Sequence, residues 1–128
     1  MRNKIYKLTT KEWERDILDN SWVIEIDGKT IKNWKDYANI ITQKMNFPTA
    51  CDKSYDVYLD WICDLSWSDS NDVSIVIINF DYFMKDNIEL KKEIISDFEN
   101  IILPWWEYEV EKCVVEGKTK LFNLYLIN

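Results

Sequence analysis

The stretch Val73–Ile78, which reads Val-Ser-Ile-Val-Ile-Ile, is almost continuous in β-branched apolar residues. A strand with one face in water alternates apolar and polar side chains, so this pattern is typical of a strand covered on both faces. Branched and aromatic residues also mark Trp22–Ile26, which precedes the turn residues Asp27-Gly28, and Leu121–Ile127. The sequence therefore predicts three strands.

Helical patterns occupy the segments between these strands. Asn33 can cap a helix with one apolar face, which ends in a polar loop over residues 46–54. A second helix is expected over residues 55–66. After the central strand, apolar residues at helical spacing predict a third major helix that Pro104 interrupts, and helix resumes over residues 105–116.

Strands separated by helices of this length pair in parallel through right-handed crossovers. We therefore expect an α/β fold in which helices pack against a small three-stranded parallel sheet. Residues 1–128 are expected to form one domain with its core in residues 22–127. Residues 1–20 are expected to be an appended helical element, because Thr9-Thr10-Lys11-Glu12 resembles a capping box that opens a helix over residues 10–18.

Composition narrows the possible functions. The chain has 128 residues, 23 acidic and 16 basic residues, a formal charge of −7 and no histidine. Without imidazole, Ser–His and Cys–His nucleophiles are excluded and an ordinary zinc site is disfavoured. The acidic balance argues against direct binding of nucleic acid, whose phosphates need cations, and favours a basic partner. We expect no cofactor.

The sequence also indicates where the protein is located. The N-terminal residues lack the apolar run of a signal peptide, and no segment approaches the roughly 18 apolar residues that span a bilayer. We therefore expect a cytoplasmic protein that does not contact membranes.

Cys51, Cys63 and Cys113 are expected to be buried reduced thiols rather than a disulfide or a metal site. Trp105 and Trp106 are expected to pack in the core rather than form an exposed patch for self-association.

Four acidic residues recur at every fourth position of the chain, namely Asp52, Asp56, Asp60 and Asp64. If the second helix includes the last three, they occupy a sector about 80° wide, because each residue turns a helix by about 100°. Val57 and Trp61 border this sector, and most of the remaining helix surface is apolar. The helix is therefore expected to be covered everywhere except along one acidic edge.

This acidic edge has two interpretations. It can be a solvated face that keeps an acidic protein in solution, at a cost of a few tenths of a kcal/mol for each like-charge pair. It can also be a docking ridge that imitates consecutive phosphates and binds arginine and lysine. In that case the carboxylates beside Trp61 and Val57 would lose water on docking, and charge pairs would couple strongly.

Two parts of the chain, within residues 26–31 and 47–65, resemble the barstar family of ribonuclease inhibitors. Ile26–Ile31 looks like the opening strand and turn of that family. Phe47-Pro48, followed by Tyr55–Leu65, is similar to its loop and second helix, and the spacing from the proline to the two aspartates matches without a gap. The resemblance covers residues 22–127 and agrees with the order of strands and helices above.

The resemblance implies a mode of binding. The family presses this loop and helix into the active-site cleft of a secreted or delivered ribonuclease, with aspartates in place of substrate phosphates. Carried over, that role falls on Asp56 and Asp60, with Asp60 as the dominant anchor. An acidic contact from the last helix is also implied, and either Glu111 or Glu116 could supply it.

The sequence also departs from the family pattern. The family's loop tyrosine corresponds to Ala50, and its loop glycine corresponds to Asp52. The tryptophan between the two aspartates corresponds to Leu59, whereas Trp61 lies two positions later. These departures bear on the identity of the target more than on the fold.

We therefore expect an immunity protein, not an enzyme, that binds a basic nuclease toxin as a monomer in a 1:1 complex. The expected contact residues are Asp52, Asp56, Asp60, Asp64, Val57, Trp61, Ala50 and Lys53. One alternative is immunity to a toxin that is not a ribonuclease, bound through another surface. Another is a metal-dependent hydrolase that uses Asp56 and Asp60, although such metal sites usually take oxygen ligands from several segments.

Overall fold

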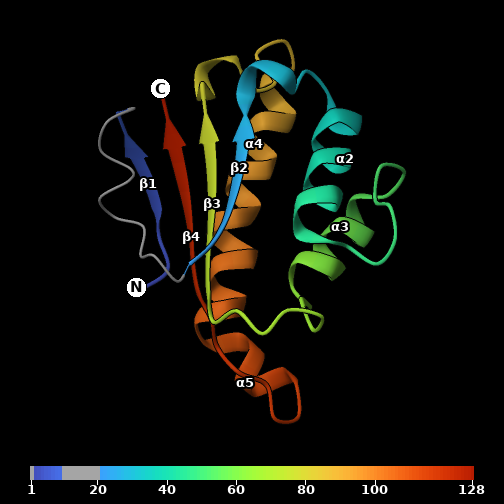
Figure 1. The fold of residues 1–128 in the computed structure, drawn as a ribbon, viewed down its shortest axis with the longest axis vertical. Helices are drawn as coiled ribbons and strands as arrows, with labels where there is room; N and C mark the ends of the chain where they lie inside the picture. The colour runs from blue at the N-terminus through green and yellow to red at the C-terminus, as the bar shows by residue number, and fades with distance from the viewer. Residues whose placement is uncertain (1, 10–20) are drawn as a thin grey trace.

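A computed structural model of the chain describes residues 2–9 and 21–128 and has an α/β architecture (Figure 1). Its sheet is parallel throughout, with the strand order β1-β4-β3-β2. The strands are Ile5–Leu8 (β1), Trp22–Asp27 (β2), Asp72–Ile78 (β3) and Leu121–Ile127 (β4). The prediction of a parallel α/β fold is confirmed, but the prediction of three strands is wrong, because the sheet has four.

Helices bury their apolar sides against one face of this sheet. The longer helical segments are α2 (Trp34–Met45), α3 (Tyr55–Ile62) and α4 (Ile88–Asp97), followed by η3 (Phe98–Ile102), η4 (Trp105–Glu109) and α5 (Val110–Cys113). Ile75 and Ile77 of β3 face the helices, whereas Val76 is buried on the opposite face with Tyr125. The central strand is thus buried on both faces, as its continuous apolar sequence predicts.

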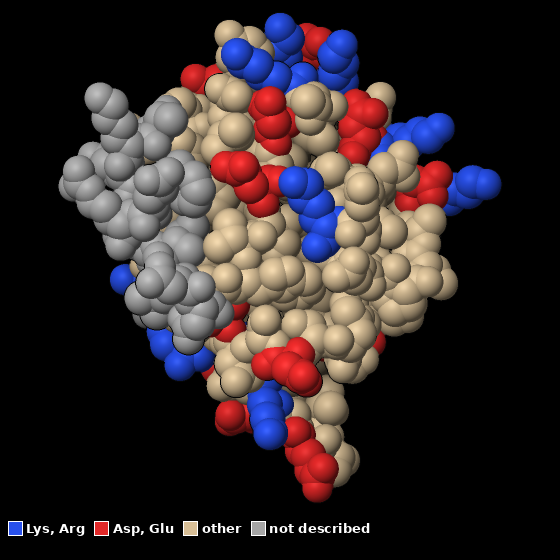
Figure 2. Space-filling view, viewed as in Figure 1, with Lys and Arg blue, Asp and Glu red and all other residues tan. Residues whose placement is uncertain are grey.

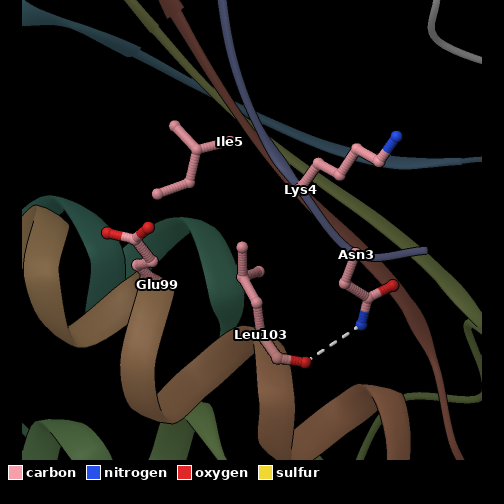
Figure 3. A pocket seen from close by; sticks show the side chains of 5 residues that line it. All are labelled: Asn3, Lys4, Ile5, Glu99 and Leu103. Carbon is pink, nitrogen blue, oxygen red and sulfur yellow. Dashed lines mark hydrogen bonds between the residues drawn. The ribbon is translucent and has the colours of Figure 1, made fainter. Parts of the chain in front are cut away.

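The additional strand, β1, pairs with β4 along its whole length, from Ile5 beside Leu124 to Leu8 beside Ile127. Asn3 fixes the chain just before it, because its Nδ2 donates to the carbonyl oxygens of Leu103 and Lys120 at 3.2 and 3.1 Å. Figure 3 shows the bond from Asn3 to Leu103. The helix predicted over residues 10–18 lies outside the described residues.

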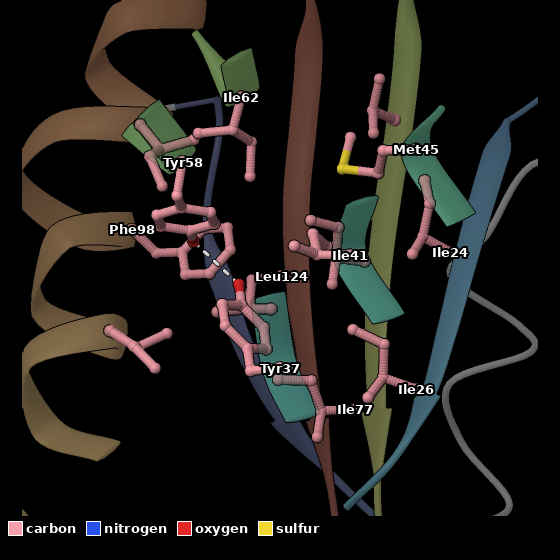
Figure 4. Packing of buried hydrophobic residues seen from close by; sticks show 14 of the residues in the cluster. Ile24, Ile26, Tyr37, Ile41, Met45, Tyr58, Ile62, Ile77, Phe98 and Leu124 are labelled. Atoms are coloured by element: carbon pink, nitrogen blue, oxygen red, sulfur yellow. Dashed lines mark hydrogen bonds between the residues drawn. The ribbon is translucent and has the colours of Figure 1, made fainter. Parts of the chain in front are cut away.

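The two helices that follow β2 meet through an aromatic cluster. Asn33 caps α2 as predicted, accepting a hydrogen bond from the Asp36 backbone N–H at 2.9 Å. The hydroxyls of Tyr37 on α2 and Tyr58 on α3 lie 2.8 Å apart in the core (Figure 4). The Tyr55 ring packs beside that of Tyr58, with centroids 5.4 Å apart, and the Tyr55 hydroxyl donates to Asp97 of α4 at 2.6 Å. Hydrogen bonds between side chains therefore join α3 to both neighbouring helices.

The helical segment around Pro104 is continuous from Ile88 to Cys113, so the predicted interruption is wrong. Pro104 has helical dihedral angles (φ −63°, ψ −35°) and lies between the π-helical segments η3 and η4. A π turn pairs an N–H with the carbonyl five residues earlier, so it changes which carbonyl lacks a donor beside a proline. Proline thus remains within the helical path instead of ending it.

Three smaller predictions have different outcomes. The three cysteines are free thiols, but only Cys51 is buried, whereas Cys63 is half-buried and Cys113 is exposed. Trp106 is buried and Trp105 packs against the core, as predicted. Within the described residues, no helix combines the length and apolar character needed to cross a membrane.

The contacts of Asn3 predict that β1 contributes to stability. Asn3 is 2% exposed, and its Oδ1 also accepts from the Phe122 backbone N–H at 3.1 Å. Asn3→Ala should lower the free energy of unfolding by about 1–3 kcal/mol, because it leaves buried backbone groups without partners. Urea unfolding measures this change, and the exposed Lys4→Ala is the control. Equal stability of the two variants would contradict an anchoring role for Asn3.

The buried tyrosine pair predicts loss of stability at alkaline pH. Burial raises the pKa of Tyr37 and Tyr58 above the ordinary value. The unfolded chain releases these protons near pH 10 and the folded chain retains them, so stability falls as pH rises above about 10. In the variant with Tyr37→Phe and Tyr58→Phe, the fall should be shallower by up to about 1.4 kcal/mol per pH unit for each tyrosine. Urea unfolding between pH 9 and pH 11 tests this, and an unchanged slope would contradict it.

Candidate functional site

The loop between α2 and α3 is fixed at its first end by aromatic side chains. Phe47 is buried, and its ring lies against Trp67 with centroids 6.1 Å apart. Trp67 donates from Nε1 to the Met45 carbonyl at 2.9 Å and packs edge-on against Trp61. Trp61 in turn donates from Nε1 to the Thr49 hydroxyl at 2.9 Å. The loop is therefore connected to the helix that follows it.

Cys51 anchors the middle of the same loop. Its side chain is 1% exposed, and the thiol donates to the Ala38 carbonyl at 3.8 Å and lies 3.4 Å from the Thr42 hydroxyl. Burial raises the pKa of the Cys51 thiol, which favours the protonated, unreactive form. Cys51 thus serves as a packing residue rather than a nucleophile.

The loop residues beside these anchors face solvent to different extents. Ala50 and Lys53 are exposed, and Asp52 is half-buried. The Ser54 backbone N–H donates to the Cys51 carbonyl at 3.2 Å, which brings the chain back toward α3. The loop therefore presents Ala50, Asp52 and Lys53 from a backbone that is held at several points.

Ser54 begins α3 and sets the position of its first aspartate. The Ser54 hydroxyl accepts a hydrogen bond from the Val57 backbone N–H at 3.3 Å. Asp56 lies in the first turn and is exposed, so its carboxylate interacts favourably with the positive end of the helix dipole. Ser54 thus caps α3, and Asp56 lies in its first turn.

The acidic edge of α3 consists of Asp56 and Asp60. Both are exposed and lie four residues apart, so their side chains share one side of the helix. Val57 and Trp61 are half-buried beside them, whereas Tyr58 and Ile62 are fully buried on the opposite side. Two carboxylates thus lie next to partly apolar surface on a helix that the core holds in place.

Asp64 does not belong to this helical edge. The helix ends at Ile62, and Leu65 adopts a left-handed backbone conformation with φ 51° and is 1% exposed. The Ile62 carbonyl accepts a hydrogen bond from Trp106 Nε1 at 2.9 Å instead of continuing the helix. Burial of Leu65 and this capping by Trp106 end α3 earlier than residue 66. Asp64 is therefore exposed in the turn that follows the helix.

One residue important to the site was missed by sequence reasoning. Trp67 follows α3 in a stretch that looks polar, yet its indole connects Phe47, Met45 and Trp61. The only signal in the sequence is a large aromatic residue within that polar stretch.

Between the two aspartates, Leu59 is half-buried, which leaves less aromatic surface than a tryptophan would offer.

A metal site finds no geometric support among residues 2–9 and 21–128. In that part of the chain, no three or more Cys, Asp or Glu side chains come close enough together to hold a metal ion. The arrangement of Asp56 and Asp60 instead suits charge-assisted hydrogen bonds to cationic side chains.

The cap of α3 yields a prediction about stability. Ser54→Ala should lower the free energy of unfolding by about 1 kcal/mol, because it removes the acceptor for the first turn. Ser66→Ala, at an exposed serine beyond the helix, should change stability by less than about 0.5 kcal/mol. Urea unfolding of both variants tests the difference. A Ser54→Ala protein as stable as the control would show that the observed cap does not support the helix.

Comparisons with known proteins identify a family. A search of curated proteins and a search of solved structures each found no match. A model of the family described as Barstar (barnase inhibitor) matches residues 22–116, from β2 to the residues just beyond α5. β1 lies outside the matched residues. Because the match covers well over half of the 128 residues, the chain belongs to the barstar family.

Proposed function

We propose that this chain is an immunity protein that inhibits a barnase-like ribonuclease toxin by covering its active site. Barstar-family proteins are inhibitors that bind a nuclease, and the chain's membership supports the same class of partner here. The chain would act in the cytoplasm of the cell that makes the toxin. It would bind the toxin in a 1:1 complex and would need no catalytic group or cofactor.

The observation that carries this proposal is the acidic edge of α3. Asp56 and Asp60 are exposed on one side of a helix, and the half-buried Val57 and Trp61 lie beside them. A ribonuclease binds consecutive phosphates with cationic side chains, and two carboxylates one helical turn apart can occupy such positions. Val57 and Trp61 would exclude water around the new charge pairs and so strengthen them.

Preorganisation supports tight binding by this surface. The loop is held by Cys51 and by the bond between Thr49 and Trp61, while the other side of α3 is buried. A surface that is already ordered loses less conformational entropy when it binds. Asp52 before the helix and Asp64 after it extend the negative charge at both ends. This charge would speed encounter with a basic enzyme.

The loop and helix also contain the features that would select the target. Ala50 is small and exposed, and Leu59 is half-buried between the two aspartates. A nuclease matched to this chain would therefore fill space at Ala50 and present an apolar rather than a stacking surface to Leu59. Lys53, which is exposed beside Asp52, would pair with an acidic group of that nuclease.

Substitution of the aspartates tests the proposal. Asp60→Asn should weaken binding to a barnase-like ribonuclease by about 2–5 kcal/mol, mainly through faster dissociation, because a desolvated cation loses its partner. Asp56→Asn should have a smaller effect in the same direction. Glu25→Gln, an exposed change of the same charge on β2, is the matched control and should change affinity little. Surface plasmon resonance would measure both rate constants, first with barnase and then with a basic nuclease encoded beside this chain.

The outcomes separate the alternatives. Weaker binding of the nuclease with Asp60→Asn but not with Glu25→Gln supports the acidic edge as the contact surface. If a nuclease binds the native chain and both aspartate variants equally, the contact surface is wrong and another surface carries immunity. If only a toxin without ribonuclease activity is bound, the proposed target class is wrong.

Salt provides an independent test of the charge contribution. The association rate should fall as ionic strength rises, because salt screens the attraction between the acidic edge and a basic enzyme. The dissociation rate should change much less. Stopped-flow measurements over a range of salt concentrations check this, and an association rate that does not depend on salt would contradict electrostatic steering.

A further inference from the structure

A second charged surface lies beyond the carboxyl ends of β2 and β3. The segments that follow these strands, η1 (Gly28–Thr30) and η2 (Phe80–Tyr82), border a hollow of about 330 Å³. It is lined by Lys29, Lys32, Tyr82, Lys85 and Asp86, which we call the lysine hollow. Figure 2 shows basic side chains gathered at this end of the molecule, at the top of the view.

The backbone beneath the lysine hollow is cross-linked. The Met84 N–H donates to the Ile31 carbonyl at 2.9 Å, and both residues are buried. Lys32 and Lys85 each follow one of these two bonded residues, so their backbone positions are fixed relative to one another.

A second set of contacts joins η1 to the end of β3. Asn79 donates from Nδ2 to the Asp27 carboxylate at 2.9 Å. A Cβ atom at Gly28 would lie 2.4 Å from the Asn79 carbonyl oxygen, so only glycine allows this close approach. The two segments that carry the lysines therefore form one platform rather than two independent loops.

Tyr82 brings two of the ammonium groups together. The Nζ atoms of Lys29 and Lys85 lie 5.1 and 5.5 Å from the centre of the Tyr82 ring, within the range of cation–π attraction. Tyr82 is 49% exposed, so a ligand in the hollow can reach it. Two long side chains thus converge on one ring instead of extending separately into solvent.

The positive charge of the hollow is not neutralised by ion pairs. Among the described residues, no carboxylate lies within salt-bridge distance of Lys29, Lys32 or Lys85. The Asp27 carboxylate instead accepts hydrogen bonds from Asn79 and from the Lys29 backbone, and Asp36 accepts from the Lys32 backbone. With three lysines and one aspartate in its lining, the hollow is positive in a chain whose net charge is −7.

We infer that the lysine hollow binds a phosphate-bearing small ligand, independently of the proposed binding of a nuclease. Lysine ammonium groups bind phosphate oxygens as point charges and donate up to three hydrogen bonds each. Three of them around one hollow suit the several oxygens and the double negative charge of a phosphoryl group. The ligand is either inorganic phosphate or the phosphate of a nucleotide, whose base could contact Tyr82.

Titration of the full chain by heteronuclear NMR tests this inference. Inorganic phosphate, adenosine monophosphate and adenosine are added separately at constant ionic strength, because salt alone screens exposed charges. Phosphate and the nucleotide should shift the amide signals of residues 28–32 and 82–86. In the variant with Lys29→Gln, Lys32→Gln and Lys85→Gln, the dissociation constant should rise about tenfold or more, since loss of charged hydrogen bonds weakens binding to that extent.

A control with the same change in net charge distinguishes the site from general attraction. Lys44→Gln, Lys92→Gln and Lys118→Gln alter three exposed lysines elsewhere and should leave binding unchanged. Tighter binding of the nucleotide than of phosphate would assign a nucleotide ligand, whereas equal binding would assign the phosphoryl group alone. The inference is overturned if no signals shift in these two segments, if adenosine binds as well as its monophosphate, or if both triple variants lose affinity equally. Nuclease binding by the variants is measured separately, so failure of this site does not bear on the proposed inhibitor function.

Discussion

Burial of the aromatic side of α3 is the constraint on which the acidic edge depends. The helix has only eight residues, and a helix of that length is marginal in water on its own. Tyr58 and Ile62 are fully buried, and hydroxyl hydrogen bonds join Tyr58 to α2 and Tyr55 to α4. These contacts fix the rotation of the helix, so Asp56 and Asp60 must face solvent. Packing of α3 in the core therefore offsets the repulsion between the two aspartates. The same repulsion would destabilise an isolated helix.

Structural elements that local sequence determines could be predicted, whereas elements that depend on tertiary contacts could not. The continuous apolar run of β3 and the Asn33 cap of α2 identify their elements locally. β1 has only four residues, including the polar Lys7, and becomes a strand because β4 offers an edge with which it can pair. A proline normally ends or kinks a helix. Around Pro104, the neighbouring π turns and the packing of Trp106 keep the chain helical.

The same distinction applies to the candidate site. The spacing of Asp56 and Asp60 was sufficient to place both on one side of α3, since helical periodicity alone decides it. The position of Asp64 depends on where the helix ends, and burial of Leu65 together with the Trp106 hydrogen bond decides that. The role of Trp67 exists only once the loop and the helix are folded together. The sequence thus predicts the chemistry of the acidic edge better than it predicts the residue at which that edge ends.

The segments that lead to the two charged surfaces adjoin opposite ends of α2. Lys32 precedes the first residue of this helix by two positions, and the loop that leads to α3 follows its last residue, Met45. A helix of 12 residues is about 18 Å long. Exposed charges interact weakly beyond the Debye length of about 8 Å at physiological ionic strength. Charge neutralisation in the lysine hollow should therefore leave the field at the start of the loop after Met45 almost unchanged. One fold can thus present an acidic surface to a basic protein and a basic hollow to an anion, because salt screens the attraction between exposed charges of opposite sign.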